Sequence, residues 1–141
     1  MSTRSAIIIE NKDGTAEGIY CHSDGYPEHQ APILLKHYNT EERVRQLIAL
    51  GDLSVLRENI GEKHDFDKDS EKAYKNKWCT AYTRDRGEDT PPTSGKNWQE
   101  VASQIDHNHE VYIYRVGLKW HYQGYSTDGE LTPLKNVKLI F

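Results

Sequence analysis

The sequence lacks the long apolar run that a membrane-spanning helix needs. No stretch of its 141 residues approaches the ~20 consecutive apolar residues that cross a bilayer as a helix. The first apolar run, residues 6–9, is also too short for the hydrophobic segment of a secretory signal peptide. We therefore expect a protein of the cytoplasm that has no membrane partner.

Cysteine is scarce. The two cysteines, Cys21 and Cys79, lie far apart and form no CxxC pair, the arrangement typical of zinc and redox sites. In a cytoplasmic protein we expect both to be free thiols. Side chains that can bind a metal follow Cys21 closely, at His22, Asp24 and His29. Their spacing fits no zinc pattern, so we predict neither a metal nor another cofactor.

Positive charge is in deficit, because the net charge is -4. A protein that neutralises many phosphates of duplex nucleic acid is normally basic, so we expect no duplex nucleic acid as a partner. The net charge still allows a local basic pocket that binds a small anion. The chain also contains no GxxxxGK[ST], GxGxxG or GxSxG, so P-loop, Rossmann and α/β-hydrolase chemistry are not indicated.

Two segments resemble known functional motifs but do not match them fully. Residues 65–76 begin like an EF-hand loop, but Ser70 and Asn76 stand where that loop needs Gly and Glu. His107, Asn108 and His109 spell HNH, but the nuclease of that name spreads these residues over a ββα fold. We therefore predict neither calcium binding nor nuclease activity here.

Aromatic residues are plentiful and supply much of the expected core, with nine Tyr, three Trp and two Phe. Alternating or β-branched runs predict strands at residues 6–10, 18–21, 78–83, 110–116 and 119–125, with a further edge strand at 136–141. Helical spacing predicts helices at residues 32–38, 40–51 and 98–105, with a short turn opened by Asp52. This order favours an α+β fold, with a mainly antiparallel sheet of about five strands and helices packed on one face.

We predict a single domain over residues 1–141. Residues 62–77 are dense in charge and nearly free of apolar side chains, so they are interpreted as a charged peripheral insertion.

Two polar loops are candidate sites. In the first, His22 and Asp24 could form an oriented imidazole for acid–base catalysis beside Tyr26, although Asp24 before Gly25 is by itself more typical of a hydrogen-bonded turn. In the second, residues 84–88, two guanidiniums near a glycine suit a phosphate or carboxylate, although such charge runs are commonly exposed loops. The predicted ligand-binding residues are Tyr26, Arg84, Arg86 and Glu88.

Several segments together resemble a family of short bacteriophage and prophage proteins. They are MSTRS at residues 1–5, IYCHxDGYPE at 19–28, LLxxY at 34–38, LGDxS at 50–54 and RDRGE at 84–88. The sequence departs from the family pattern at Ser23, where a Trp is usual, and lacks a Gly that is usual a few residues after Glu28. The resemblance implies a phage source and favours one shared functional site for the two loops, without implying a mechanism.

Two functions follow as hypotheses. The first is an accessory protein that binds a nucleotide-like anion or a host protein and so counteracts a host process such as defence, in the host cytoplasm. The second is a small enzyme acting on a phosphoester or glycosidic bond, with His22 and Asp24 as the acid–base pair and the arginines holding the anion. Under both hypotheses, we expect His22 and Asp24 to lie beside Arg84 and Arg86. This arrangement requires strands 18–21 and 78–83 to run in the same direction.

Overall fold

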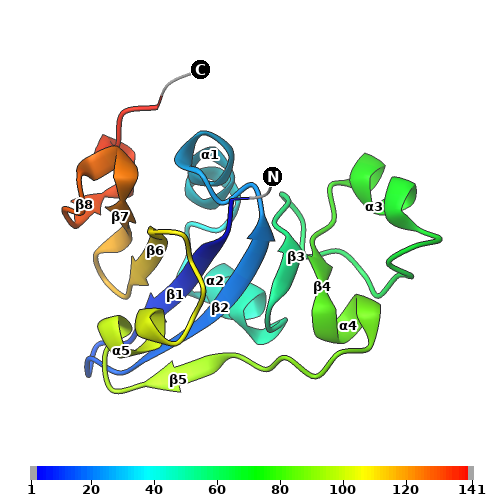
Figure 1. The fold of residues 1–141 in the computed structure, drawn as a ribbon, viewed down its shortest axis with the longest axis horizontal. Coiled ribbons are helices and arrows are strands. Elements are labelled where there is room, and N and C mark those ends of the chain that lie inside the picture. The colour runs from blue at the N-terminus through cyan, green and yellow to red at the C-terminus, as the bar shows by residue number, and fades with distance from the viewer. Residues whose placement is uncertain (1–2, 140–141) are drawn as a thin grey trace.

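The protein is built on one mixed sheet. A computed structural model describes residues 3–139, which form eight strands, five α-helices and two 3-10 helices (Figure 1). The strands are β1 (Ser5–Glu10), β2 (Ala16–Ser23), β3 (Leu53–Val55), β4 (Thr80–Ala81), β5 (Thr93–Gly95), β6 (Glu110–Arg115), β7 (Lys119–Gly124) and β8 (Thr132–Pro133). The helices are α1 (Pro27–His37), α2 (Glu41–Ala49), α3 (Ser70–Asn76), α4 (Tyr82–Arg86), α5 (Trp98–Ser103), η1 (Tyr125–Thr127) and η2 (Leu134–Asn136).

The strand order confirms the α+β class but corrects the expected sheet. Neighbouring strands follow the order β4-β3-β2-β1-β6-β7-β8, and β5 also pairs with β2. The β1–β6 and β2–β3 pairs are parallel, and the other pairs are antiparallel. Long connections, which include helices, let parallel strands lie side by side. The additional strands β3, β5 and β8 have only two or three residues, too few to show an alternating pattern.

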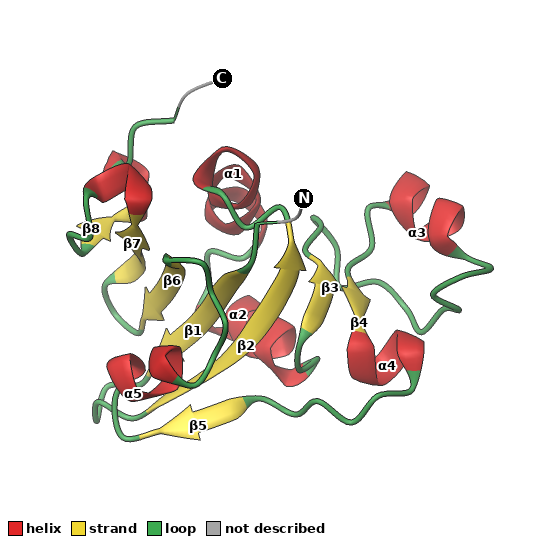
Figure 2. Ribbon diagram, in the orientation of Figure 1, coloured by secondary structure: helices red, strands yellow, loops and turns green. Residues whose placement is uncertain are grey.

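Strand β1 explains why helices cover both faces of the sheet. Its apolar run is continuous because alternate side chains enter two separate cores. Ile7 and Ile9 pack with residues of α1 and α2, whereas Ala6 and Ile8 pack with residues of α5. Figure 2 shows α2 behind the strands and α5 in front of them. The expectation of helices on one face was therefore wrong.

Helix α2 follows its predicted signals, whereas α1 begins at Pro27 rather than at Pro32, and α4 replaces the end of the strand expected at residues 78–83. Thr40 caps α2 by accepting a hydrogen bond from the Arg43 backbone N–H, as predicted, and Gly51 follows the helix with φ +76°. Asp52 does not start another helical turn, because its carboxylate accepts the backbone N–H of Tyr20 and β3 follows it. No helix within residues 3–139 is long and apolar enough to cross a membrane.

The charged segment 62–77, which includes α3, lies beside the β4 edge of the sheet, near α4 (Figure 1). Most of its side chains are exposed, but His64 and Ala73 are buried. At the other end of the chain, residues 137–139 form no strand, and the edge strand is β8 instead. Ile140 and Phe141, the end of the expected strand, lie outside the described residues.

Both cysteines are buried, free thiols. Burial raises the pKa of the Cys21 thiol to about 12 and also raises the pKa of Cys79. Because the thiolate is the reactive species, we expect labelling of the native protein with an aromatic disulfide reagent to be roughly 100-fold slower than labelling of the unfolded chain. Absorbance of the released thiolate, with and without guanidinium, measures both rates. Fast labelling of the native protein would contradict this.

Candidate functional site

One edge of the sheet collects polar residues that are distant in the sequence. Strand β1 is antiparallel to β2 and parallel to β6, and β6 is antiparallel to β7. Strands β2 and β7 therefore end at the edge where β6 begins. This geometry brings Tyr26, Glu110 and Tyr125 to the same end of the molecule.

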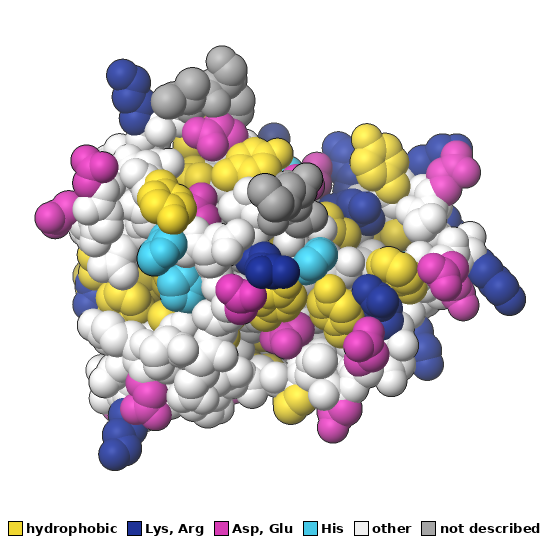
Figure 3. All heavy atoms as spheres, in the orientation of Figure 1, with side chains coloured by type: hydrophobic (Ala, Val, Ile, Leu, Met, Phe, Trp, Pro, Cys, Tyr) yellow, Lys and Arg dark blue, Asp and Glu magenta, His cyan; other side chains and the backbone are white. Residues whose placement is uncertain are grey.

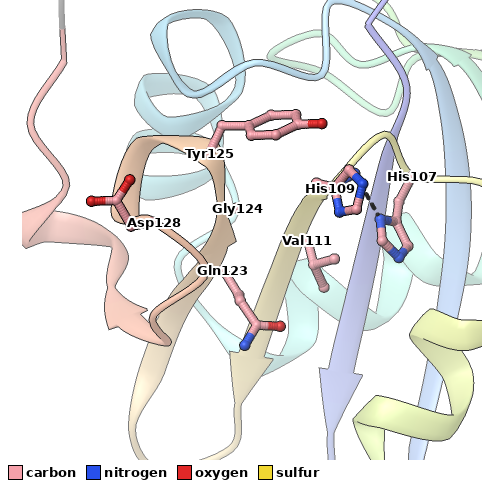
Figure 4. Close-up of a pocket in the computed structure, with 8 residues that line it drawn as sticks. His107, His109, Val111, Gln123, Gly124, Tyr125 and Asp128 are labelled. Atoms are coloured by element: carbon pink, nitrogen blue, oxygen red, sulfur yellow. Dashed lines mark hydrogen bonds between the residues drawn. The ribbon is translucent and has the colours of Figure 1, made fainter.

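Two adjoining cavities lie at this edge, with volumes of about 310 Å³ and about 670 Å³. His107, His109 and Tyr125 line both, and we call the pair the His107–Tyr125 hollow. Tyr26 and Glu110 line the larger cavity. Figure 4 shows Tyr125 reaching from η1 toward His109, with the side chains from β6 and β7 beneath. Cavities of this size suit a small-molecule ligand.

The loop before β6 has an unusual backbone conformation. Asn108 and His109 both lie in the left-handed region, with φ of 46° and 60°. Such residues cost roughly 1 kcal/mol or more each and are enriched at functional sites. The turn is held by two hydrogen bonds: the His109 N–H donates to His107 Nδ1 (3.0 Å), and the Glu110 N–H donates to the His107 carbonyl (2.8 Å).

His107 is thereby fixed as a neutral hydrogen-bond donor. A backbone N–H can only donate, so His107 Nδ1 accepts and the ring proton is on Nε2. Burial, together with the neighbouring His109, lowers the pKa of His107, which favours the same neutral form. Its Nε2–H can then act only as a donor.

Tyr125 provides an exposed aromatic surface at the rim. Its side chain is 71% exposed, and its ring centroid lies 5.1 Å from that of His109. The His107 and His109 rings are 6.1 Å apart. The planes of neighbouring rings are inclined by 77° and 60°, so a planar ligand can stack on the exposed Tyr125 ring but not on all three rings together.

Glu110 is the buried ionisable group of the hollow. The residue is 4% exposed, and its Oε1 accepts a hydrogen bond from the Tyr122 hydroxyl. Burial raises the pKa of the Glu110 carboxyl to about 7, although the bonds from Tyr122 and from the Tyr125 backbone lower it. A carboxyl with this pKa is present in both protonation states near neutral pH, so it can donate or accept a hydrogen bond or a proton.

His22 and Asp24 do not form the predicted pair. His22 Nδ1 lies 2.6 Å from the Tyr20 hydroxyl, so tyrosine rather than aspartate orients the imidazole. Asp24 adopts φ 54°, as the turn interpretation allowed, and lines a different cavity, of about 280 Å³, that also contains Arg57. Within the described residues, no hydrogen bond joins His22 to Asp24.

A basic side chain connects His22 with the hollow. Arg4 NH1 lies 3.0 Å from Asp106 Oδ2, and Asp106 lines the larger cavity. Arg4 also interacts with the Tyr20 hydroxyl, the partner of His22. Figure 3 shows histidines gathered on one face with basic and acidic side chains between them. Arg4 belongs to the MSTRS segment, whose Met1 and Ser2 lie outside the described residues.

Arg84 and Arg86 do not lie beside His22 and Asp24. That arrangement requires β2 and β4 to run in the same direction, and they do not. Strand β2 is parallel to β3 and β3 is antiparallel to β4, so β2 and β4 run in opposite directions. Arg84 binds Asp85 and the Cys79 carbonyl. Arg86 stacks on Phe66, at 4.1 Å, and pairs with Glu88 at 3.2 Å.

The predicted residues are therefore divided among separate places. Tyr26 lines the His107–Tyr125 hollow, His22 is linked to it through Arg4, and Arg86 and Glu88 line a third, acidic cavity. Phe66 borders both that cavity and the cavity of Asp24. Sequence reasoning missed Glu110 and the His107–His109 turn. The available signal was a carboxylate at the start of an otherwise apolar strand, directly after a polar His-Asn-His turn.

Comparisons with known proteins assign neither a family nor a function to the chain. No protein-family model, no curated protein and no solved structure matches the chain. Among residues 3–139, no three His, Cys, Asp or Glu side chains are grouped so that they could hold a metal ion. A function therefore has to be argued from the residues of the hollow.

Proposed function

We propose that the protein is a bacteriophage or prophage accessory protein that captures a nucleotide-like anion in the His107–Tyr125 hollow. Acting in the host cytoplasm, it would thereby counteract a host process such as defence. The observation that carries this proposal is the exposed Tyr125 ring beside His109, at a cavity that His107 and Glu110 also line. The phage source is supported by the sequence resemblance.

The hollow offers a planar ligand both stacking and hydrogen bonds. Stacking of a base on an aromatic side chain contributes about 1–3 kcal/mol. The His107 Nε2–H and the Glu110 carboxyl add polar groups that can fix the orientation of the base.

The charged end of such a ligand has a partner at the rim. Arg4 is paired with Asp106 through side chains that are 42% and 66% exposed, so the contact is solvated and contributes little to stability. A ligand phosphate can replace Asp106 on the guanidinium, which binds oxyanions with two parallel hydrogen bonds.

Changing Tyr125 to Ala is expected to weaken binding of a ribonucleoside monophosphate by about 1–3 kcal/mol, because it removes the stacking ring. Calorimetric titration of the wild type and the variant with AMP, CMP, GMP and UMP measures the change. Tyr74→Ala is the matched control, since Tyr74 is 69% exposed but lies on α3. Equal losses in both variants, or binding of no nucleotide, would overturn the proposal.

A second candidate is an acid–base enzyme acting on a phosphoester or glycosidic bond of a similar ligand. Glu110 favours it, because a carboxyl with a pKa of about 7 is suited to donate and accept protons at neutral pH. In this version Glu110 replaces the pair predicted at His22 and Asp24. Product formation from a bound nucleotide, followed by chromatography, separates an enzyme from a binder.

A further inference from the structure

Building on the proposed function, we infer that Glu110 selects the base of the ligand. The selected base carries an accepting ring nitrogen next to an amino group on its Watson–Crick edge, as adenine and cytosine do. The phosphate end then lies toward Arg4, outside the hollow.

The Tyr122 hydroxyl decides which oxygen of Glu110 carries the proton. Tyr122 donates to Oε1, so that oxygen is an acceptor and the protonated carboxyl bears its hydrogen on Oε2. The carboxyl then presents an O–H donor beside a C=O acceptor. This pair complements a ring nitrogen next to an amino group, which offers an acceptor beside a donor.

The surroundings of Glu110 favour the protonated form. Glu110 is buried, and Glu28 on α1 adds a like charge that disfavours ionisation. Tyr122 on β7 and Tyr112 on β6 stay neutral, because burial raises the pKa of both phenols. The neighbouring His107 is held neutral by its backbone bond. The bonds from Tyr122 and from the Tyr125 backbone favour the carboxylate, but no cation among these groups adds to them and the effect of burial is larger.

The rest of the hollow also favours a base over a free oxyanion. Asp106 and Asp128 line its two cavities, and the nearby Arg4 is neutralised by Asp106. Inorganic phosphate alone therefore meets carboxylates without the compensation of stacking. A neutral heterocycle avoids that repulsion and gains the Tyr125 ring.

Nucleoside pairs that differ only at this edge test the inference. Adenosine and inosine exchange donor and acceptor at both positions, and so do cytidine and uridine. We expect adenosine or cytidine to bind at least roughly tenfold more tightly than its partner, because a mismatched buried polar group loses its hydrogen bond. Calorimetry at about pH 6 gives the ratio. Equal affinities, or preference for inosine and uridine, would overturn the inference.

The affinity for adenosine should depend on pH with a definite sign. Binding requires the protonated carboxyl, so affinity is constant below the pKa of about 7 and falls about tenfold per pH unit above it. Adenosine does not titrate in this range. An affinity that rises between about pH 6 and pH 8, or stays constant, contradicts the inference.

Glu110→Gln separates this inference from the proposed function. The amide keeps a donor beside an acceptor but cannot titrate, so adenosine binding should persist within about threefold and lose its pH dependence. Glu88→Gln changes an exposed residue that follows α4 and does not line the hollow, so it should leave the pH dependence intact. If nucleotides bind through Tyr125 without base preference, only the inference fails, whereas absence of all nucleotide binding removes both. Should the Gln variant misfold, the wild-type pH profile and the nucleoside pairs still decide.

Discussion

Changing Asp85 to Ala is expected to lower the free energy of unfolding by about 3–5 kcal/mol, the cost of removing one partner from a buried ion pair. The Asp85 side chain is fully buried, and its Oδ1 and Oδ2 accept three donors. These donors are the backbone N–H groups of His64 and Ala81 and the Nε of Arg84. Without the carboxylate, all three donors and the Arg84 charge lose their partner. Urea unfolding followed by circular dichroism measures the loss.

Glu88→Ala is the matched control for Asp85→Ala. Glu88 follows α4 and also pairs with an arginine, but its side chain is 53% exposed. An exposed pair contributes about 0–1 kcal/mol, so this variant should unfold almost like the wild type. Similar stabilities for the two variants would mean that Asp85 does not organise this region.

The Asp85 contacts explain why Arg84 differs from its predicted role. Arg84 is 17% exposed, and its guanidinium is occupied by Asp85 and by the Cys79 carbonyl. Through the His64 and Ala81 backbones, the same carboxylate ties the charged segment 62–77 to β4. The run Arg-Asp-Arg-Gly-Glu suggested an anion site, but its aspartate joins segments that are distant in the sequence. Such long-range partners leave no local pattern.

Local signals predicted the elements that depend on neighbours in the sequence. Helix α2 was predicted from the Thr40 cap and from Gly51, and strands β6 and β7 from their alternating side chains. Strand β3 was missed because Asp52 resembles a helix cap, whereas its carboxylate binds the distant Tyr20 backbone. The parallel pairing of β1 with β6 joins segments about 105 residues apart, and no periodicity in the sequence predicts such a contact.

The candidate site also combines a residue with a local sequence signal and residues that depend on long-range contacts. Tyr26 lies in the expected loop after a strand and lines the hollow, while its role in ligand binding stays a prediction. The burial of Glu110 depends on Tyr122, which faces it only because β6 and β7 pair in one particular register. That register places Glu110 opposite Gly124. The importance of this glycine is visible only in three dimensions.

Changing Gly124 to Ala is expected to cost about 3 kcal/mol of stability and to abolish the hollow's binding function. The backbone of Gly124 is extended, so alanine meets no conformational strain there. An added Cβ would instead lie 2.6 Å from Glu110 Oε1, and it would also overlap the Tyr122 hydroxyl and the His109 carbonyl. Because carbonyl and strand backbone cannot move away easily, the Glu110–Tyr122 hydrogen bond and the turn before β6 must both shift.

Gly129→Ala distinguishes this steric effect from the general cost of replacing a glycine near the hollow. Gly129 also lines the smaller cavity, but nothing lies within 4 Å of an added Cβ. Its φ of +81° makes alanine strained, which costs about 1–2 kcal/mol without displacing any neighbour. We therefore expect Gly129→Ala to melt at a lower temperature yet bind adenosine as the wild type does, whereas Gly124→Ala loses both stability and binding. If Gly124→Ala binds normally, the close contact of β7 with the Glu110 carboxyl is not what shapes the site.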